Sequence, residues 1–519
     1  MSRQARTGIA RLFLYPIAAL SLVLGFRVLG PSDLGRHVDQ SKTLAFTADI
    51  VLNRQFFLPR DATGAKTLKP PLVNWIGALL PALGFWDEWA LKMPSILGAV
   101  ATVLLCAWMT RRLMRALLEA DAFEPRDAAP SAASRERWAS AAGAAAGVVY
   151  LASVDTIKHA YFLRPDMLNT ALLTVAWVLA TIGLTEDQPR RQLIALGFWI
   201  AIGLAFLTKG PTALIAVLYA ALAARLLHGR WAALDRLGWR WGLPLAVAMF
   251  GIWLVPAYLI DPYHVTHRLI GIETVDRLIG RANQGPWPLS ALATSWDLPA
   301  WLVLRSIPWA ILAVVALAMI GPRRWFRHPL SPAILWLFAV LLFFVPVARR
   351  GGSYVLPAYP AVATLAVYAL IRGVGRVRLA PSRAPALGLL TVVALLVGHL
   401  VIPFETGAGD HQKAFTRKAR QIVRDDPVVF MGLRDSSTIT LFGRHQIEPL
   451  SPEAVRAAKW VVRPVDASPD PFDAAELELV ETSEPVRSTR DNGSGVQLGL
   501  YRRLGNSARS TWSKAGRPN

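Results

Sequence analysis

The sequence contains little cysteine and little charge. Its single cysteine, Cys106, lies inside an apolar stretch, which excludes an internal disulfide and a thiolate metal site. Only 18% of the 519 residues are charged, whereas 54% are hydrophobic, and the mean hydropathy is +0.37. The apolar residues also come in long blocks. This composition excludes an ordinary soluble protein and indicates a polytopic membrane protein.

Several motifs of soluble enzymes are missing as well. The chain has no Walker A loop, no Rossmann glycine fingerprint and no serine nucleophile elbow in a suitable setting. His264, His267 and His411 do not stand at metal-ligand spacing, so no catalytic zinc is predicted. The net charge is +21, but the basic residues gather in short loops between apolar blocks, where topology requires them. We therefore predict no binding of nucleic acid.

Apolar blocks long enough to cross a bilayer, roughly 20 residues each, recur as far as residue 404. We predict eleven spans, at 11–30, 91–110, 138–155, 167–185, 192–207, 211–227, 242–260, 300–320, 331–348, 354–371 and 384–404. The block 70–86 is short, opens on two prolines and contains Pro81, so we interpret it as an interfacial or re-entrant helix. If it crosses, every later loop inverts unless a further helix is added within 284–298.

The distribution of Lys and Arg sets the orientation, because basic residues accumulate on the cytoplasmic side. With a cytoplasmic N-terminus and a first helix that is retained rather than cleaved as a signal peptide, all the basic loops fall inside: 111–137, 186–191, 225–241, 321–329 and 372–383. The outer segments are then 31–90, 156–166, 208–210, 261–299, 349–353 and everything after 404. The prediction is a multi-pass inner-membrane protein with a periplasmic C-terminal region.

The composition changes at about residue 405, where acidic and polar residues increase. Short runs at 428–433, 437–443, 459–465 and 496–504 are typical of strands, and 411–424 and 451–458 are typical of helices. We predict three parts: a membrane domain at 1–404 with an outer loop at 31–90, a small α/β domain at 405–505, and a disordered basic tail at 506–519.

Charged residues at the outer ends of the predicted spans are candidates for function, because a charge at a bilayer edge is costly unless it is paired or hydrated. They are Asp39, Lys69, Arg164, Asp166, Lys209, Arg349 and Arg350, with Arg277 in the long outer loop. Cations can neutralise a phosphate while a carboxylate takes a proton from an attacking hydroxyl. This arrangement suits an anionic lipid-linked donor.

Four segments resemble the polyprenyl-phosphate-sugar glycosyltransferases of the GT-C superfamily, the branch of the protein O-mannosyltransferases and the lipid A aminoarabinose transferases. The first runs from Asp39 through Phe56, Pro59 and Arg60 to Lys69-Pro70-Pro71-Leu72 and Trp75. The others are YFLRPDML at 161–168, FLTKGP at 206–211 and RRGGSYVLPAYP at 349–360. The resemblance covers about residues 10–375 and implies a GT-C fold with about 11–13 transmembrane helices.

The resemblance also implies a reaction and roles for its residues. The chain would transfer one sugar from a polyprenyl-phosphate donor, such as an undecaprenyl-phosphate sugar, to lipid A, a protein or a cell-envelope glycan, without a cofactor or metal. Asp39 would activate the acceptor, and Lys69, Arg277, Arg349 and Arg350 would hold the donor phosphate. Asp166, with Arg164, would be a second outer acid that positions the acceptor or the first-loop helix, and Lys209 and Tyr354 belong to two of the matched motifs. The sequence departs from the lipid A branch at Leu68 and Gln40, and Asp33 competes with Asp39 as the base.

Simpler roles stay open for the same residues. Asp39 could cap a helix, Lys69 could anchor a juxtamembrane helix, and Lys209 could only end its helix. Arg164 and Asp166 could pair with each other. A lipid or solute transporter or flippase, or a non-catalytic scaffold, are the rival functions. A transporter should show broken helices near the midplane and a repeat between its halves.

Overall fold

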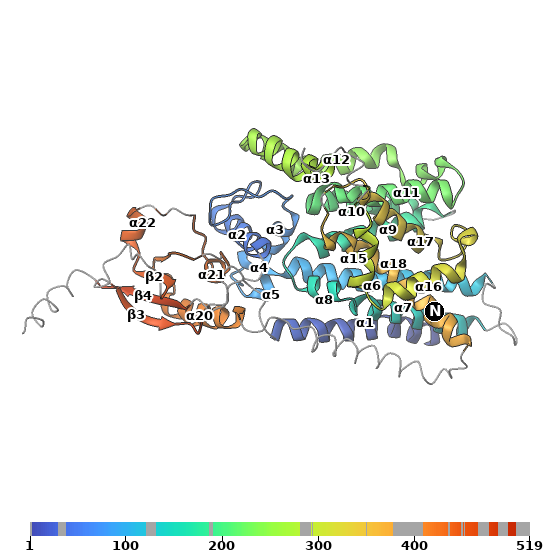
Figure 1. Cartoon of the computed structure of the whole chain (residues 1–519), viewed down its shortest axis with the longest axis horizontal. Coiled ribbons are helices and arrows are strands. Elements are labelled where there is room, and N and C mark those ends of the chain that lie inside the picture. The colour runs from blue at the N-terminus through green and yellow to red at the C-terminus, as the bar shows by residue number, and fades with distance from the viewer. Residues whose placement is uncertain are drawn as a thin grey trace, which may run out of the picture. The chain divides into compact units, whose positions relative to one another are not determined.

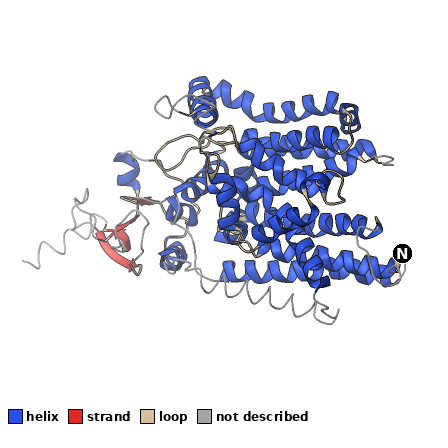
Figure 2. Ribbon diagram, turned by 45° about the vertical axis from the view of Figure 1, so that its right-hand side comes forward, coloured by secondary structure: helices blue, strands red, loops and turns tan. Residues whose placement is uncertain are grey.

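The structure is a computed structural model in which helices predominate and one small sheet lies near the C-terminus (Figures 1 and 2). It describes residues 3–29, 38–120, 131–185, 190–280, 292, 294–348, 350–376, 408–433, 436–447, 450, 452–465, 477–485 and 497–504. The predicted span 384–404 and the predicted tail 506–519 lie outside these residues. The chain divides into two compact units, of which the first is 1–26, 68–73 and 94–402 and the second is 27–67, 74–93 and 403–519.

The first unit is a helical bundle whose long helices lie side by side (Figure 2). Its helices are α1 (Arg3–Leu29), which ends beyond the boundary of the unit, α6 (Met93–Glu119), α7 (Ala132–Leu151), α8 (Val154–Ala160), α9 (Pro165–Leu184), α10 (Arg191–Lys209), α11 (Leu214–Leu226), α12 (Trp239–Ile260), α13 (Asp276–Ile279), α15 (Asp297–Arg305), α16 (Trp309–Ile320), α17 (Ser331–Phe344) and α18 (Tyr359–Arg376). Shorter turns join them: η1 (Gly210–Ala213), η2 (Trp231–Leu237), the π-helical η3 (His264–Val275), η5 (Pro322–Arg324) and η6 (Gly352–Ala358).

Several helices are suited to a membrane. Among the described residues, five helices are long and apolar enough to cross, or up to seven if each of two bent pairs is one span. Shorter apolar helices lie at Leu12–Val28, Leu72–Ala82 and Ser331–Phe344. The chain is thus a multi-pass helical membrane protein, as predicted. The segment 70–86 forms only the short helices α3 (Leu72–Gly77) and α4 (Leu79–Ala82).

The helical stretch Arg191–Leu226 reverses direction at its middle, because the middle contacts the start of α9 while both arms contact the end of α9, where Ile194 lies against Gly183. Lys209 at the end of α10 bonds to Asp166 at the start of α9, whereas Tyr219 in α11 bonds to Thr181 near the end of α9. Gly210 makes the reversal possible, since its φ of 62° is one that side chains with a Cβ rarely adopt. The two separate predicted spans, 192–207 and 211–227, correspond to the two arms.

Two predicted spans are broken. The predicted span 300–320 contains a sharp bend, because α15 and α16 meet at 114° around Pro308, which has no N–H to continue the helical ladder. The span 138–155 ends early at Leu151, and α8 continues at 77° to α7. Each break places polar groups at the end of a short helix.

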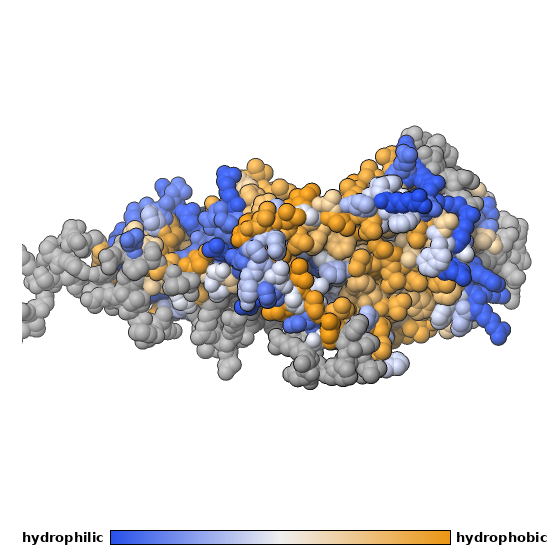
Figure 3. Space-filling view, turned by 90° about the horizontal axis from the view of Figure 1, so that it is seen from above, coloured by the Kyte–Doolittle hydropathy of each residue, from blue (hydrophilic) through white to orange (hydrophobic). Residues whose placement is uncertain are grey.

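Helix α12 has an apolar surface that is largely exposed. Only 17% of this apolar helix is buried, and Val247, Ile252, Val255 and Leu259 are all exposed. Figure 3 shows apolar side chains covering much of one face of the molecule. An exposed apolar surface of this extent is expected where lipid replaces water as the solvent.

The second unit contains α2 (Val38–Asn53), most of α3, α4, α5 (Glu88–Leu91), α20 (Ala408–Val423), α21 (Ser436–Leu441) and α22 (Pro452–Ala457). Its strands are β1 (Val428–Phe430), β2 (Trp460–Pro464), β3 (Leu477–Thr482) and β4 (Leu498–Arg503), in the order β1-β2-β4-β3. β1 and β2 are parallel and the other pairs antiparallel. A core that includes Phe415, Phe430, Phe442, Trp460 and Leu500 joins α20 and α21 to the sheet.

One strand prediction in this unit was wrong, and one strand was not predicted. The run 437–443 lies mainly in helix α21, where Ile439 and Phe442 reach the core from one helical face. β3 was missed because its sequence LELVET is largely exposed and polar, which is typical of an edge strand. The predicted strands at 428–433, 459–465 and 496–504 and the predicted helices at 411–424 and 451–458 all have counterparts.

A glycine permits the close crossing of α6 and α9. A Cβ on Gly98 would lie 2.8 Å from the backbone of Met167 and Leu168, which is closer than van der Waals contact allows. Small residues at helix crossings in membranes let backbones approach in this way. The crossing holds the start of α9, and therefore Asp166, in place.

Gly98→Ala should destabilise the protein by about 1–3 kcal/mol, the usual cost of overpacking. Gly251→Ala in α12 is the matched control, because a Cβ there meets nothing within 4 Å. The control should be neutral or stabilising by up to about 1 kcal/mol, since alanine favours helix over glycine. Thermal unfolding of both purified variants in detergent is the measurement; equal melting temperatures would contradict the tight crossing.

Candidate functional site

At the start of α9, the buried carboxylate of Asp166 pairs with two of the predicted cations, Lys209 and Arg164. Asp166 Oδ1 accepts a hydrogen bond of 2.6 Å from Lys209 Nζ, and Arg164 Nε lies 3.5 Å from Asp166 Oδ2. Pro165 opens α9, a position where proline costs no hydrogen bond, and so sets Asp166 in the first turn. The predicted pairing of Arg164 with Asp166 is present, and Lys209 joins it.

Lys209 also extends the cluster toward Tyr354. Its Nζ lies 4.7 Å from the centre of the Tyr354 ring, a cation–π contact. The Tyr354 hydroxyl accepts a hydrogen bond of 3.0 Å from Arg277 Nη1, and Arg277 Nη2 lies 2.6 Å from Glu273 Oε2. Residues from α9, α10, α13 and η6, far apart in the sequence, therefore form one connected group.

The group carries more positive than negative charge. Three cations, Arg164, Lys209 and Arg277, face two carboxylates, Asp166 and Glu273. The Arg277 side chain is 42% exposed, whereas that of Lys209 is 19% exposed. Arg277 therefore presents the accessible positive charge, while Lys209 is committed to Asp166. A phosphate that met Arg277 would find a charge already oriented by Tyr354 and Glu273.

Arg350 is positioned differently from these residues. Its side chain is 1% exposed; Nε lies 3.2 Å from Asp297 Oδ1, and Nη2 donates to Thr294 Oγ1 at 2.6 Å. It also donates to the backbone carbonyl oxygens of Phe344 and Val345. These bonds fix the end of α17 against the start of α15. Arg349 lies outside the described residues.

A second charge cluster, in which the acid is buried and the arginine is partly exposed, was missed by the sequence analysis. Arg305 Nη1 lies 3.1 Å from Asp155 Oδ2, and the Tyr359 hydroxyl donates to the same oxygen at 3.2 Å. The Arg305 guanidinium lies against Gly352, where a Cβ would clash with it. Both charges fell within predicted spans, 138–155 and 300–320, and a charge inside an apolar span is itself the signal that could have found them.

In the second unit, Asp39 lies half-buried in the first turn of α2. Asn74 holds this helix by donating to Thr43 O at 2.9 Å and to Thr47 Oγ1 at 3.1 Å. Lys69 belongs to the first unit, and its binding of the donor phosphate stays a prediction.

Two buried acids shape the loop that follows α2. Asp49 Oδ2 accepts from the Arg60 backbone N–H at 2.7 Å, and His445 Nε2 lies 3.3 Å from Asp49 Oδ1. Asp61 Oδ1 accepts from Thr63 and from the backbone N–H of Ala65. Burial lowers the pKa of His445 against the opposing effect of Asp49 and Asp61. These acids are structural, because they fix the backbone of the loop after α2.

The described part of the chain holds no group of three or more His, Cys, Asp or Glu residues arranged to bind a metal ion. The described groups can supply electrostatic and acid–base chemistry. Carboxylates can accept protons, and oriented cations can stabilise a developing phosphate charge.

Sequence comparison with known proteins finds arabinosyl transferases. No protein-family model matches the chain. An undecaprenyl phosphate-α-4-amino-4-deoxy-L-arabinose arabinosyl transferase 2 of Pseudomonas fluorescens strain Pf0-1 is 25% identical over 76% of this chain and 67% of its own length. A transferase of the same name from Aeromonas salmonicida is 23% identical over 66% of this chain. The chain spans 56% of the length of the second relative.

The fold has solved counterparts. The crystal structure of ArnT from Cupriavidus metallidurans bound to undecaprenyl phosphate matches 94% of this chain and 97% of its own, with a TM-score of 0.61 and 15% identity. The apo structure of the same protein gives a TM-score of 0.62. The chain therefore has the fold of this ArnT structure, a GT-C fold, and its sequence is similar to those of the undecaprenyl-phosphate aminoarabinose transferases.

Proposed function

We propose that the protein is an integral-membrane glycosyltransferase that moves a single sugar from a polyprenyl-phosphate donor to an acceptor on the periplasmic face. The observation that carries the proposal is the Asp166–Lys209–Tyr354–Arg277 group, in a chain whose fold matches a protein crystallised with undecaprenyl phosphate. The first donor to assay is undecaprenyl phosphate-α-4-amino-4-deoxy-L-arabinose, which the relatives' names contain. Lipid A is the first acceptor, ahead of protein and other envelope glycans.

The proposed reaction is an inverting displacement. An acceptor hydroxyl attacks the anomeric carbon and forms the new glycosidic bond, while the bond from that carbon to the phosphate oxygen breaks. Asp39 takes the hydroxyl proton, and the polyprenyl phosphate leaves with the bonding electron pair. Arg277 and Lys69 stabilise the charge on the departing phosphate. Arg349 supplies a further cation in the proposal.

The remaining predicted residues position these groups. Arg164 and Lys209 both pair with Asp166; Lys209 supports the ring of Tyr354, and Tyr354 in turn orients Arg277. Arg350 was expected to bind phosphate, but its bonds to Asp297 and Thr294 favour a role in positioning α15 and α17. We further propose an inner-membrane location with a cytoplasmic N-terminus and a periplasmic C-terminal region, based on the basic loops.

The alternative, a transporter or flippase, is favoured by one observation, the breaks between α7 and α8 and between α15 and α16. Broken helices are common in transporters. A transferase assay separates the two, because a transporter would move substrate without forming a glycosidic bond.

Asp39→Asn should abolish sugar transfer, since asparagine cannot accept the proton; general-base removal costs about 10²–10⁴ in rate. Asp425→Asn, an exposed acid of the same unit, is the control and should keep full activity. Transfer is measured by mass spectrometry with purified donor and acceptor. Full activity of Asp39→Asn at wild-type protein levels would remove the proposed base.

Arg277→Gln should reduce transfer by about tenfold or more, mainly by losing a charged hydrogen bond to the donor phosphate of about 1.5–3 kcal/mol. Arg268→Gln is the matched control, because Arg268 is exposed on the neighbouring η3. Steady-state kinetics with varied donor concentration is the measurement. Equal kinetics for the two variants would leave Arg277 without a role in the donor site.

Transfer should be independent of divalent metal, because side-chain cations can neutralise a monophosphate leaving group. Purified protein assayed in excess chelator should keep its full rate. A complete loss that magnesium or manganese restores would overturn this expectation and require metal ligands in the donor site.

A further inference from the structure

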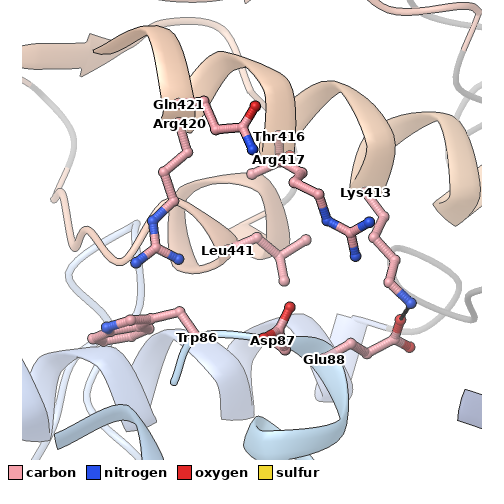
Figure 4. A pocket seen from close by; sticks show the side chains of 9 residues that line it. All are labelled: Trp86, Asp87, Glu88, Lys413, Thr416, Arg417, Arg420, Gln421 and Leu441. Atoms are coloured by element: carbon pink, nitrogen blue, oxygen red, sulfur yellow. Dashed lines mark ion pairs between the residues drawn. The ribbon is translucent and has the colours of Figure 1, made fainter. Parts of the chain in front are cut away.

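A pocket in the second unit is lined by none of the residues proposed for transfer. It has a volume of about 290 Å³ and lies between α20 and the segment 86–88 (Figure 4). Its lining residues are Trp86, Asp87, Glu88, Lys413, Thr416, Arg417, Arg420, Gln421 and Leu441. All of them belong to one compact unit. None has been used in the mechanism above.

Three cations line one side of the pocket. Lys413, Arg417 and Arg420 follow each other at helical spacing on α20, so they share a face of that helix. Figure 4 shows the guanidinium group of Arg417 directed into the pocket and that of Arg420 above Trp86. Both arginines are exposed, and the structure gives neither of them an ion-pair partner among the described residues. Their charges are therefore available to a ligand.

The edge of the pocket is built around a buried ion pair. Glu88 is 1% exposed; its Oε1 lies 2.7 Å from Nζ of the fully buried Lys92, and its Oε2 lies 3.3 Å from Lys413 Nζ. Two lysines thus share one carboxylate. Burying such a set is costly unless the geometry is held firmly, so Glu88 and Lys413 form a rigid boundary with excess positive charge.

The rest of the lining is mixed. Trp86 and Leu441 supply apolar surface, and a Cβ on Gly443 would contact the Trp86 indole at 3.3 Å, so Trp86 is packed in place. Asp87, Thr416 and Gln421 supply acceptors and donors for hydroxyl groups. A bare phosphate needs only the cations, whereas a sugar uses apolar faces and hydroxyl partners together.

We propose that this pocket binds a phosphorylated saccharide of about one sugar residue. Its volume lies near the lower end of ligand pockets, which fits one sugar phosphate and excludes a polyprenyl chain. Arg417 and Arg420 bind the phosphate, which guanidinium groups match in geometry. Asp87, Thr416 and Gln421 bind the sugar hydroxyls against Trp86. The proposal concerns binding alone and does not require transferase activity.

The test uses the full-length protein in nanodiscs and three probes: glucose 1-phosphate, glucose and inorganic phosphate. Saturation-transfer NMR titrations measure binding of the sugars, and ³¹P line broadening measures binding of phosphate. Glucose 1-phosphate should bind more tightly than either of the other probes. The double variant Arg417→Gln/Arg420→Gln should weaken its binding at least about tenfold, since each arginine supplies a charge-assisted bond.

Lys418→Gln is the matched control, because Lys418 is a cation of the same helix that pairs with Glu481 outside the pocket. It should leave binding unchanged. Equal binding of glucose and glucose 1-phosphate would overturn the phosphate site. Equal binding of inorganic phosphate would overturn the saccharide site. An equal loss in the Lys418→Gln variant would show only attraction to a basic surface and would also overturn the proposal.

Discussion

The ion pair between Asp166 and Lys209 is the interaction on which the candidate site of the first unit depends. A charge buried among apolar helices must find an opposite charge, because the bilayer offers no water to solvate it. The pair ties the start of α9 to the end of α10, next to the reversal at Gly210. Its lysine then supports Tyr354, which holds Arg277. One electrostatic requirement thus fixes both the path of the chain and the place where a cation remains accessible.

The sequence predicted the members of this group because their charges stand out against apolar helices. It could not predict their partners: Arg164 and Lys209 share one acid, and Arg277 reaches Tyr354 across 77 positions. Asp155 and Arg305 were missed because window averages treat 138–155 and 300–320 as uniform, whereas the helices break there. The helix α21 was misread because its run of Thr and Ile favours strands locally, and packing on α2 and α20 decided otherwise.

The extent of the second unit could not be predicted from local sequence patterns. A change in composition marks residue 405, but the compact unit also takes in 27–67 and 74–93. Long-range contacts such as that between Asp49 and His445 create this unit, and no local pattern reveals them. The boundary at 404/405 stays a prediction, since 377–407 lie outside the described residues. A change in composition indicates where the solvent around the chain changes from lipid to water. It does not indicate which segments fold together.

The second unit is assembled from three separate stretches of the chain, and this has a practical consequence for engineering. Ala62, from the outer loop, packs on the core formed by α20, α21 and the sheet, and Trp86 packs beside Gly443. A fragment that starts near 405 would leave those surfaces bare and would lack part of its own interior. Grafting this region between homologues must therefore carry three stretches of the gene together, so recombination within the family is constrained far from the obvious junction.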